Sequence, residues 1–144
     1  MKRILLLAAT VMTFSHAANA QDHGSVTYLG QTIPLSGYRT RVSDQKRWII
    51  AEGKKDGKLY SVTITLKPDV AAAGPVKTDA THTTTLTISN TDYSQAQNHC
   101  FDGGSTIMLT PQNGKFAVTG KELQSGNCFG KNQGNEKLSF VIKP

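Results

Sequence analysis

Tyr60-Ser61-Val62-Thr63-Ile64-Thr65-Leu66-Lys67 is the stretch of sequence that decides the fold. Its apolar residues alternate strictly with serine, threonine and lysine, and this period of two is typical of a β-strand with one buried face. Threonine suits the exposed face because its branched side chain fits the pleated backbone. The stretch therefore predicts a half-buried strand over residues 60–67.

Shorter alternating stretches elsewhere in the chain predict further strands. Asp56-Gly57 and Asn113-Gly114 lie between such stretches, and both pairs tolerate the positive φ that a two-residue hairpin turn needs. A third hairpin is expected to turn at Gly30. The eight expected strands cover residues 25–29, 31–35, 47–53, 58–67, 83–89, 105–110, 115–120 and 138–143.

The segments between these strands are short. Residues 92–98 alone have helical character, while residues 69–75 and 126–135 are rich in small and turn-forming residues and are expected to be loops. Asp102-Gly103-Gly104 is a further turn, and Pro34 indicates an edge strand because proline lacks a backbone N–H. The sequence thus predicts an all-β fold, a small antiparallel β-sandwich or barrel of about eight strands.

Residues 1–20 have the order of a secretory signal peptide. Lys2 and Arg3 precede an apolar run over residues 4–14, and Ala18-Asn19-Ala20 supplies a small-residue cleavage site. The run is about eleven residues long, shorter than the roughly 20 that a membrane-spanning helix needs. We expect cleavage after Ala20, a periplasmic or secreted location, and one exported β domain over residues 21–144.

Two cysteines, Cys100 and Cys128, are the only ones in the chain. An even number of cysteines in an exported protein predicts a disulfide, here closing a loop of 29 residues counted from Cys100 to Cys128. The chain-entropy model gives such a loop about 3.5 kcal/mol of stabilisation. We therefore expect one disulfide that matters for a domain of this size.

Positive charge is concentrated in one part of the sequence. Residues 39–58 hold seven lysines and arginines against three acidic residues, whereas the remainder of residues 21–144 is neutral. A local basic surface attracts acidic partners, so we expect the partner to be another protein with an acidic surface. The expected binding residues are Arg39, Arg41, Arg47, Lys54, Lys55 and Lys58.

Two aromatic residues, Tyr38 and Trp48, lie among these cations, a mixture that also occurs where proteins stack on single-stranded nucleic acid. The net charge of residues 21–144 is only +4, with 14 lysines and arginines against 10 acidic residues, and an exported protein rarely meets nucleic acid. We therefore expect no nucleic-acid partner. Within Trp48-Ile49-Ile50, the indole is expected to lie in the core.

Metal binding has one weak candidate at the start of the exported chain. After cleavage, Gln21-Asp22-His23 would offer an amine, two amides and an imidazole, which can surround Cu(II) or Ni(II) in a square plane. The stretch His99-Cys100-Phe101-Asp102, even with His82, lacks the paired spacing of a zinc site. No cofactor is expected.

Catalytic residues are sparse. A small envelope hydrolase using His82 or His99 is the alternative to a binding protein, since a histidine can serve as a general base. Gly104-Ser105 does not continue into the G-x-S-x-G pattern of a nucleophile elbow. The sequence therefore favours a protein that is not an enzyme.

The plan of a signal peptide, a small β domain and one disulfide resembles the exported bacterial inhibitors and immunity proteins that cap the active site of a lysozyme or toxin. Ser36-Gly37-Tyr38 is similar to a Ser-Gly loop of the periplasmic lysozyme inhibitors, with a shorter spacing to the tyrosine, and no family is assigned on it. We expect an exported, non-enzymatic binding protein, an inhibitor or immunity-type partner of another protein. The oligomeric state stays open.

Overall fold

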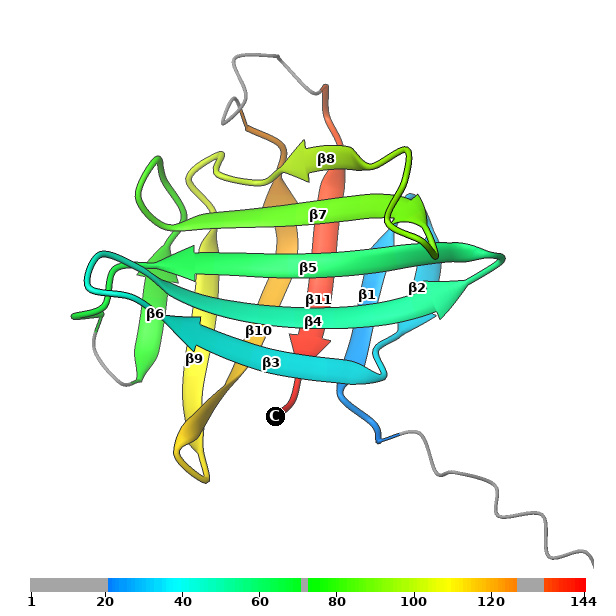
Figure 1. Ribbon diagram of the computed structural model, residues 1–144. Coiled ribbons are helices and arrows are strands. Elements are labelled where there is room, and N and C mark those ends of the chain that lie inside the picture. The colour runs from blue at the N-terminus through cyan, green and yellow to red at the C-terminus, as the bar shows by residue number, and fades with distance from the viewer. Residues whose placement is uncertain (1–20, 71–72, 127–133) are drawn as a thin grey trace, which may run out of the picture.

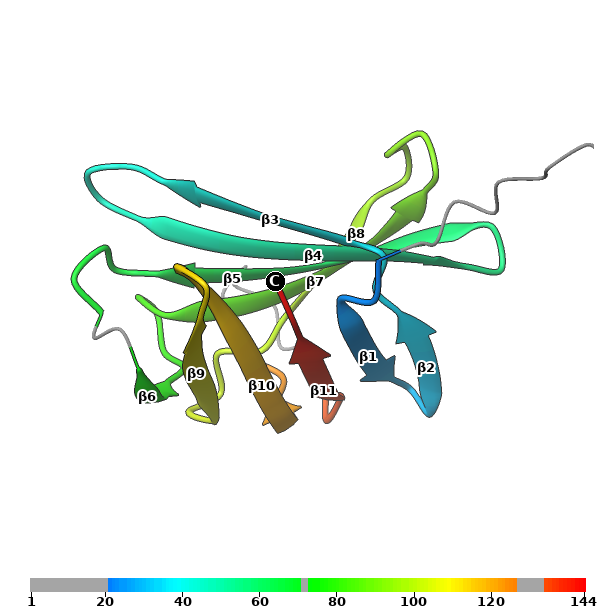
Figure 2. The same cartoon turned by 90° about the horizontal axis from the view of Figure 1, so that it is seen from below.

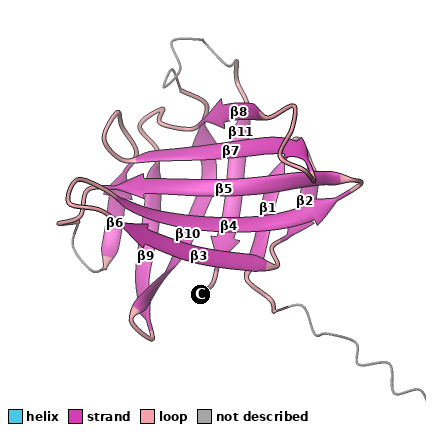
Figure 3. Ribbon diagram, in the orientation of Figure 1, coloured by secondary structure: helices cyan, strands magenta, loops and turns pink. Residues whose placement is uncertain are grey.

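The computed structural model describes residues 21–70, 73–126 and 134–144. These residues form eleven strands and no helix, and the strands pair into two antiparallel sheets (Figures 1 and 3). The prediction of an all-β antiparallel sandwich is confirmed. The expected number of about eight strands was too low.

The six-stranded sheet contains both ends of the described chain. Its first and last strands in the sequence pair with each other. From one edge to the other the sheet holds β2 (Gln31–Pro34), β1 (Gly24–Tyr28), β11 (Lys137–Ile142), β10 (Lys115–Gln124), β9 (Thr106–Gln112) and β6 (Gly74–Lys77).

The five-stranded sheet is built from the middle of the chain, and each of its strands pairs with the next one of the sheet along the sequence. It contains the longest hairpin that the sequence predicts, around Asp56-Gly57. From one edge to the other it holds β3 (Gly37–Val42), β4 (Arg47–Lys55), β5 (Lys58–Leu66), β7 (Thr83–Asn90) and β8 (Gln97–Cys100).

The two sheets form separate layers (Figure 2), and the strands of one run across those of the other (Figure 1). Alternate residues of each strand point between the layers, as the period of two requires. On β5 these residues are Val62, Ile64 and Leu66, none more than 1% exposed. The half-buried strand predicted over residues 60–67 is therefore confirmed, and its outer threonines lie on the far side of the sheet.

Three expected hairpin turns are confirmed by their backbone. Asp56 and Gly57 have φ of 50° and 73°, and Asn113 and Gly114 have φ of 51° and 74°. Gly30 has φ of 75° in the turn between β1 and β2. Pro34 ends β2, which is an edge strand as expected. Asp102-Gly103-Gly104 instead joins β8 to β9 and so leads from one sheet to the other.

Three strands were missed because all of them lie at sheet edges, where alternation is weak. β3 lies where the sequence predicts the loop before a hairpin, yet Arg39 and Arg41 pair with β4. β6 begins within the expected loop over residues 69–75 and pairs with β9. The expected helical segment over residues 92–98 is wrong, since β8 starts at Gln97. An edge strand has one neighbour and needs fewer apolar residues.

One end of the five-stranded sheet is fastened to the other sheet. Gly53 on β4 faces β2 so closely that a Cβ atom there would lie 2.0 Å from the carbonyl oxygen of Pro34. Lys55 Nζ donates a hydrogen bond of 3.1 Å to the carbonyl of Thr32 on the same strand. Glycine is thus required at position 53 for β2 and β4 to pack.

A second connection between the sheets is polar. The Tyr28 hydroxyl on β1 donates a 2.6 Å hydrogen bond to Glu136 Oε2, and His99 Nδ1 on β8 donates to the same oxygen at 3.1 Å. Burial and the carboxylate of Glu136 both disfavour the charged phenolate and raise the pKa of Tyr28. The tyrosine therefore stays a donor at neutral pH.

Candidate binding groove

The outer face of the five-stranded sheet carries ordered rows of side chains. Residues directly opposite each other in an antiparallel pair point to the same face, so the strand register defines these rows. The row nearest the β3–β4 turn ends in two hydroxyl groups and begins with a cation and an indole. It consists of Arg41 on β3, Trp48 on β4, Thr65 on β5 and Thr83 on β7.

Trp48 lies on this outer face and not in the core. Its neighbours Ile49 and Ala51 alternate onto the inner face and are fully buried, whereas Trp48 is half-buried beside Arg41. The Arg41 guanidinium lies 5.5 Å from the centre of the indole ring, a cation–π contact that holds the ring in place. The prediction of a core tryptophan was wrong because β4 buries its odd-numbered residues.

A groove of about 380 Å³ opens over the end of this row. Trp48, Thr65 and Thr83 form its floor and side, and turns at the end of the sheet supply the wall. Every polar side chain at its lining is a hydroxyl, an amide or an ammonium group, and no carboxylate is among them. The remaining lining residues are Gln45, Lys46, Leu66, Lys67, Ala80 and Thr81.

Two hydrogen-bonded turns position this wall. In the β3–β4 turn, the backbone N–H of Ser43 donates to the carbonyl of Lys46 at 2.7 Å, and the N–H of Lys46 donates to Ser43 Oγ at 3.1 Å. These bonds fold residues 43–46 back on themselves and place Gln45 and Lys46 at the groove. A serine at the start of such a turn is a common way to satisfy its backbone.

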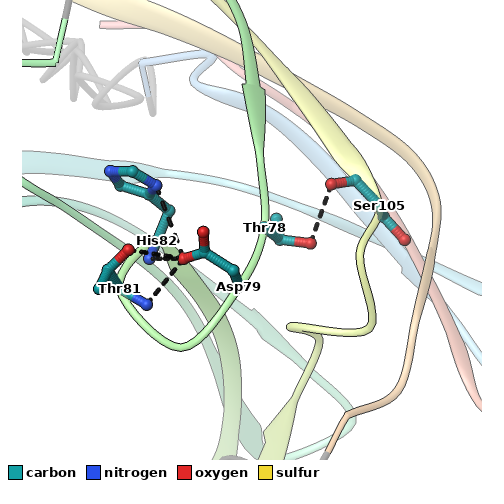
Figure 4. Close-up of polar contacts among 5 residues, drawn as sticks. All are labelled: Thr78, Asp79, Thr81, His82 and Ser105. Atoms are coloured by element: carbon teal, nitrogen blue, oxygen red, sulfur yellow. Dashed lines mark hydrogen bonds and ion pairs between the residues drawn. The ribbon is translucent and has the colours of Figure 1, made fainter.

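The second turn is fixed by a single carboxylate (Figure 4). Asp79 Oδ1 accepts hydrogen bonds from the N–H and the hydroxyl of Thr81, each 2.7 Å, and from the N–H of His82 at 2.8 Å. These donors, the Thr81 hydroxyl first, lower the pKa of Asp79 to about 2. The Thr78 hydroxyl before the turn donates to the Ser105 carbonyl, which ties the turn to the other sheet.

The cations of the groove have no charged partner of their own. The described part of the chain holds no ion pair to Lys46 or Lys67, and the only contact recorded for the Arg41 side chain there is Trp48. Their charge is therefore directed to solvent. Asp79 lies next to the groove, but its Oδ1 is taken up by the turn it holds, and the lining itself has no carboxylate. A concave site lined by unpaired cations attracts anions.

The predicted binding residues do not form one surface. Arg39 and Arg41 lie on the outer face of β3, but Arg47 points to the inner side, where its guanidinium lies 5.2 Å from the Phe116 ring of the other sheet. Lys54 follows Trp48 by six positions on β4, or roughly 20 Å at about 3.3 Å per residue. The predicted basic residues are thus divided between the two faces and the two ends of the five-stranded sheet.

Several of these predicted residues are already engaged. Arg39 makes a two-pronged ion pair with Glu52 at 2.7 and 3.0 Å. Lys58 Nζ donates to Asn90 Oδ1 at 2.7 Å, in addition to the contact of Lys55 with β2. Lys54 makes no hydrogen bond or ion pair within the described residues and lines a hollow with Asp22 and Gln21. Among the six predicted residues, only Arg41 contributes to the row at the groove.

The two candidate catalytic histidines each lie beside a carboxylate. His82 Nδ1 is 3.6 Å from Asp79 Oδ1 and lines a separate hollow of about 370 Å³, and His99 contacts Glu136. Within residues 21–70, 73–126 and 134–144, no serine or threonine hydroxyl is hydrogen-bonded to either ring. The geometry thus supplies a base and an orienting carboxylate, but no positioned nucleophile in the described residues.

The candidate metal ligands at the start of the exported chain are tied to the fold. The His23 ring is buried, stacks on Tyr38 and donates from Nδ1 to the Lys143 carbonyl at 2.9 Å, while its backbone N–H donates to the Leu35 carbonyl. Asp22 pairs with Lys143 at 3.1 Å, and Gln21 is exposed. A square-planar metal site there would have to break these contacts.

Acidic and metal-ligating side chains are otherwise dispersed. Across the described ranges, no three side chains of His, Cys, Asp or Glu gather closely enough to hold a metal ion. Cys100 is fully buried, and its predicted partner Cys128 lies outside the described residues, as do residues 1–20. None of the described segments contains a helix with the length and apolarity to cross a bilayer.

Comparison with known proteins adds no relative. No protein-family model, curated protein or solved structure matches this chain.

Lys46 and Lys67 are the cations of the groove that the sequence did not indicate as binding residues. Lys46 was counted in the basic band but not among the binding residues, and Lys67 was assigned only to the strand over residues 60–67. The signal that could have found them is parity. If Ile49 and Ala51 face inward, Trp48 must face outward. Lys46 precedes Trp48 by two positions, and Lys67 follows Thr65, the residue opposite Trp48, by two positions, so both lysines are expected on the same outer face.

Proposed function

We propose that this protein is an exported, non-enzymatic binding protein that takes an acidic partner on the outer face of its five-stranded sheet. Export is supported by the charged, apolar and small-residue order of residues 1–20. A periplasmic or secreted location follows from that order. The partner class expected from the sequence, another protein with an acidic surface, remains the starting hypothesis, with inhibition or immunity as its biological setting.

The groove beside Trp48 is the observation that supports this proposal. Lys46 and Lys67 lie at a concave surface with no carboxylate in its lining, and neither forms an ion pair in the described residues. An acidic group that enters the groove would meet cations that do not first have to break an ion pair within the protein. At the hairpin tip, by contrast, Lys55 and Lys58 would first have to leave their present acceptors.

A rigid scaffold is part of the proposal, because binding loops act best when a packed sheet holds them. We propose a disulfide between Cys100 and Cys128 as one element of that scaffold. Cys100 is fully buried at the end of β8, and there is no free cysteine among the described residues. Such a bond would tie the end of the five-stranded sheet to the segment before β11.

Affinity capture with two matched variants tests the proposal. The exported chain, residues 21–144, is immobilised and offered the envelope and secreted fractions of its source and, separately, poly-L-aspartate as a defined acidic polymer. The variants are Lys46→Glu/Lys67→Glu at the groove and Lys54→Glu/Lys58→Glu at the hairpin tip. Both change the net charge by the same amount.

We expect the groove variant to lose at least tenfold in affinity for poly-L-aspartate, and the hairpin variant to lose less than threefold. A protein partner from the fractions should follow the same order, and neither variant should change the melting temperature by more than a few degrees. Equal loss by both variants would mean that net charge alone is sensed. No binding of either ligand by the unmodified chain would overturn the proposal.

A further inference from the structure

We infer that the groove beside Trp48 accepts an acidic sugar, a uronic-acid unit of a polysaccharide. This inference rests on the proposed function, because it keeps the groove as the site for an acidic partner, and it names an acidic polysaccharide in place of an acidic protein. It is argued from the three kinds of side chain that meet there: an indole, a set of hydroxyl and amide groups, and two ammonium groups.

The indole supplies a flat apolar wall of fixed orientation. Trp48 lines the groove, and the Arg41 guanidinium 5.5 Å from its ring centre restrains the ring from the β3 side. The carbon-bound hydrogens of a sugar ring carry partial positive charge and pack on the negatively polarised face of an aromatic ring. A restrained indole therefore offers a sugar ring a stacking surface that loses little entropy on binding.

The hydroxyl groups supply partners that both donate and accept. Thr65 and Thr83 are directly opposite each other on β5 and β7, and no hydrogen bond within the described part of the chain occupies either hydroxyl. Gln45 adds an amide at the wall, and the Thr81 oxygen can still accept although its proton goes to Asp79. Sugar hydroxyl groups require this mixture of donors and acceptors.

The ammonium groups of Lys46 and Lys67 supply the charge. They lie on two different elements, the β3–β4 turn and the end of β5, so they approach the groove from two positions. A uronic acid presents its carboxylate at the edge of the ring, so that the ring can stack while the carboxylate meets a cation. A neutral sugar would leave both charges unused.

The size and course of the surface also fit a polysaccharide. The volume of about 380 Å³ lies within the range of small-molecule sites. The neighbouring row of the same face continues with Ile50, Thr63 and Thr85, so that a second unit could follow the first along the sheet. An aspartate or glutamate side chain of a protein would reach the lysines but would leave the indole and the hydroxyl pair without partners.

Trp48 is the only tryptophan of the chain, so its fluorescence reports directly on the groove. The exported chain is titrated with tetragalacturonate, with neutral galactotetraose, with poly-L-glutamate and with an oligothymidylate. The variants are Lys46→Gln/Lys67→Gln and Thr65→Val/Thr83→Val, and Lys54→Gln/Lys58→Gln is the charge-matched control. Isothermal calorimetry gives affinities that do not depend on the indole.

We expect tetragalacturonate to change the Trp48 emission and to bind at least tenfold more tightly than the neutral tetramer and poly-L-glutamate. Both groove variants should lose at least fivefold in affinity, and the Lys54→Gln/Lys58→Gln control less than twofold. Loss in the threonine variant separates a sugar from a simple anion, because its charge is unchanged.

Three results would overturn the inference. If poly-L-glutamate binds as tightly as tetragalacturonate and Thr65→Val/Thr83→Val has no effect, the groove reads acidic protein segments, and the proposed function survives while the sugar does not. If the oligothymidylate binds most tightly, the indole stacks on nucleic-acid bases and the groove does not select an acidic sugar. If no probe binds or changes the emission, both the inference and the proposed function fail.

Discussion

The two ends of the five-stranded sheet both carry cations but use most of them differently. At the hairpin end, Lys55 and Lys58 donate hydrogen bonds to the protein itself, and the sheet is fastened to β2. At the groove end, Lys46 and Lys67 face solvent beside Trp48. Charge counted along a sequence therefore does not reveal which charges are available to a partner. The pairing of each side chain decides that.

The largest expected effect concerns the fastened end. Gly53→Ala would place a methyl group 2.0 Å from the Pro34 carbonyl oxygen, so β2 and β4 must move apart, and we expect a loss of about 2–3 kcal/mol in the free energy of unfolding. Gly37→Ala is the matched control, because its Cβ would meet Glu52 at an ordinary 3.9 Å. Denaturant titration measures both. Equal stability of the two variants would remove the distinction between fastened and free ends.

A pH experiment sharpens the comparison by loosening the polar connection between the sheets. The pKa of Tyr28 is raised in the fold above its ordinary value of 10.0, so the stability it contributes is complete below about pH 10 and is lost as the pH rises further. Tyr28→Phe should therefore show a weaker alkaline loss of melting temperature than the unmodified chain. The exposed Tyr93, changed to Phe, is the control. Parallel alkaline profiles for all three proteins would refute the role of Tyr28.

A smaller effect is expected at the groove end, where the wall depends on local turns. The pKa of Asp79 is lowered to about 2 from 3.8, so its contribution is present above about pH 4 and is lost as the pH falls toward 2. The Trp48 emission should change over this window, and Asp79→Ala should show the changed emission already at neutral pH. If the Trp48 emission of the unmodified chain and of Asp79→Ala depends on acid pH in the same way, the turn held by Asp79 does not shape the groove.

The smallest effect tests the local potential. Iodide should quench Trp48 more strongly than a neutral quencher of similar access does, since the free cations at the groove concentrate anions. We expect Lys46→Gln/Lys67→Gln to reduce iodide quenching about twofold and Lys54→Gln/Lys58→Gln to leave it unchanged. Stern–Volmer plots provide the measurement. Equal reduction in both variants would indicate a diffuse field.

Much of the fold follows from the sequence, because central strands are buried on one face and must alternate. Val62, Ile64 and Leu66 show this pattern, and the turns at Asp56-Gly57 and Asn113-Gly114 follow from their tolerance of positive φ. The edge strands could not be recognised, since pairing on one side makes few demands on their residues. β3 and β8 are mostly polar for that reason.

The candidate site was harder to predict because it depends on which face each residue takes and on what pairs with it. Trp48-Ile49-Ile50 looks like a buried run, but the strand alternates and sends the indole outward. Parity could have placed Lys67 on the outer face, but not the wall that Ala80 and Thr81, in the turn held by Asp79, add beside the end of β5. Such encounters between distant segments carry no local signal in the sequence.

The most direct test of the account is a backbone amide and indole NMR titration of the exported chain with tetragalacturonate. We predict that the largest shift changes lie at Trp48, Thr65 and Thr83 and in the two turns beside them, and that the hairpin tip around Asp56 shows almost none. Shift changes centred on Lys54, Lys55 and Lys58, with the Trp48 indole unmoved, would contradict the central claim that the groove end of the sheet is the binding end.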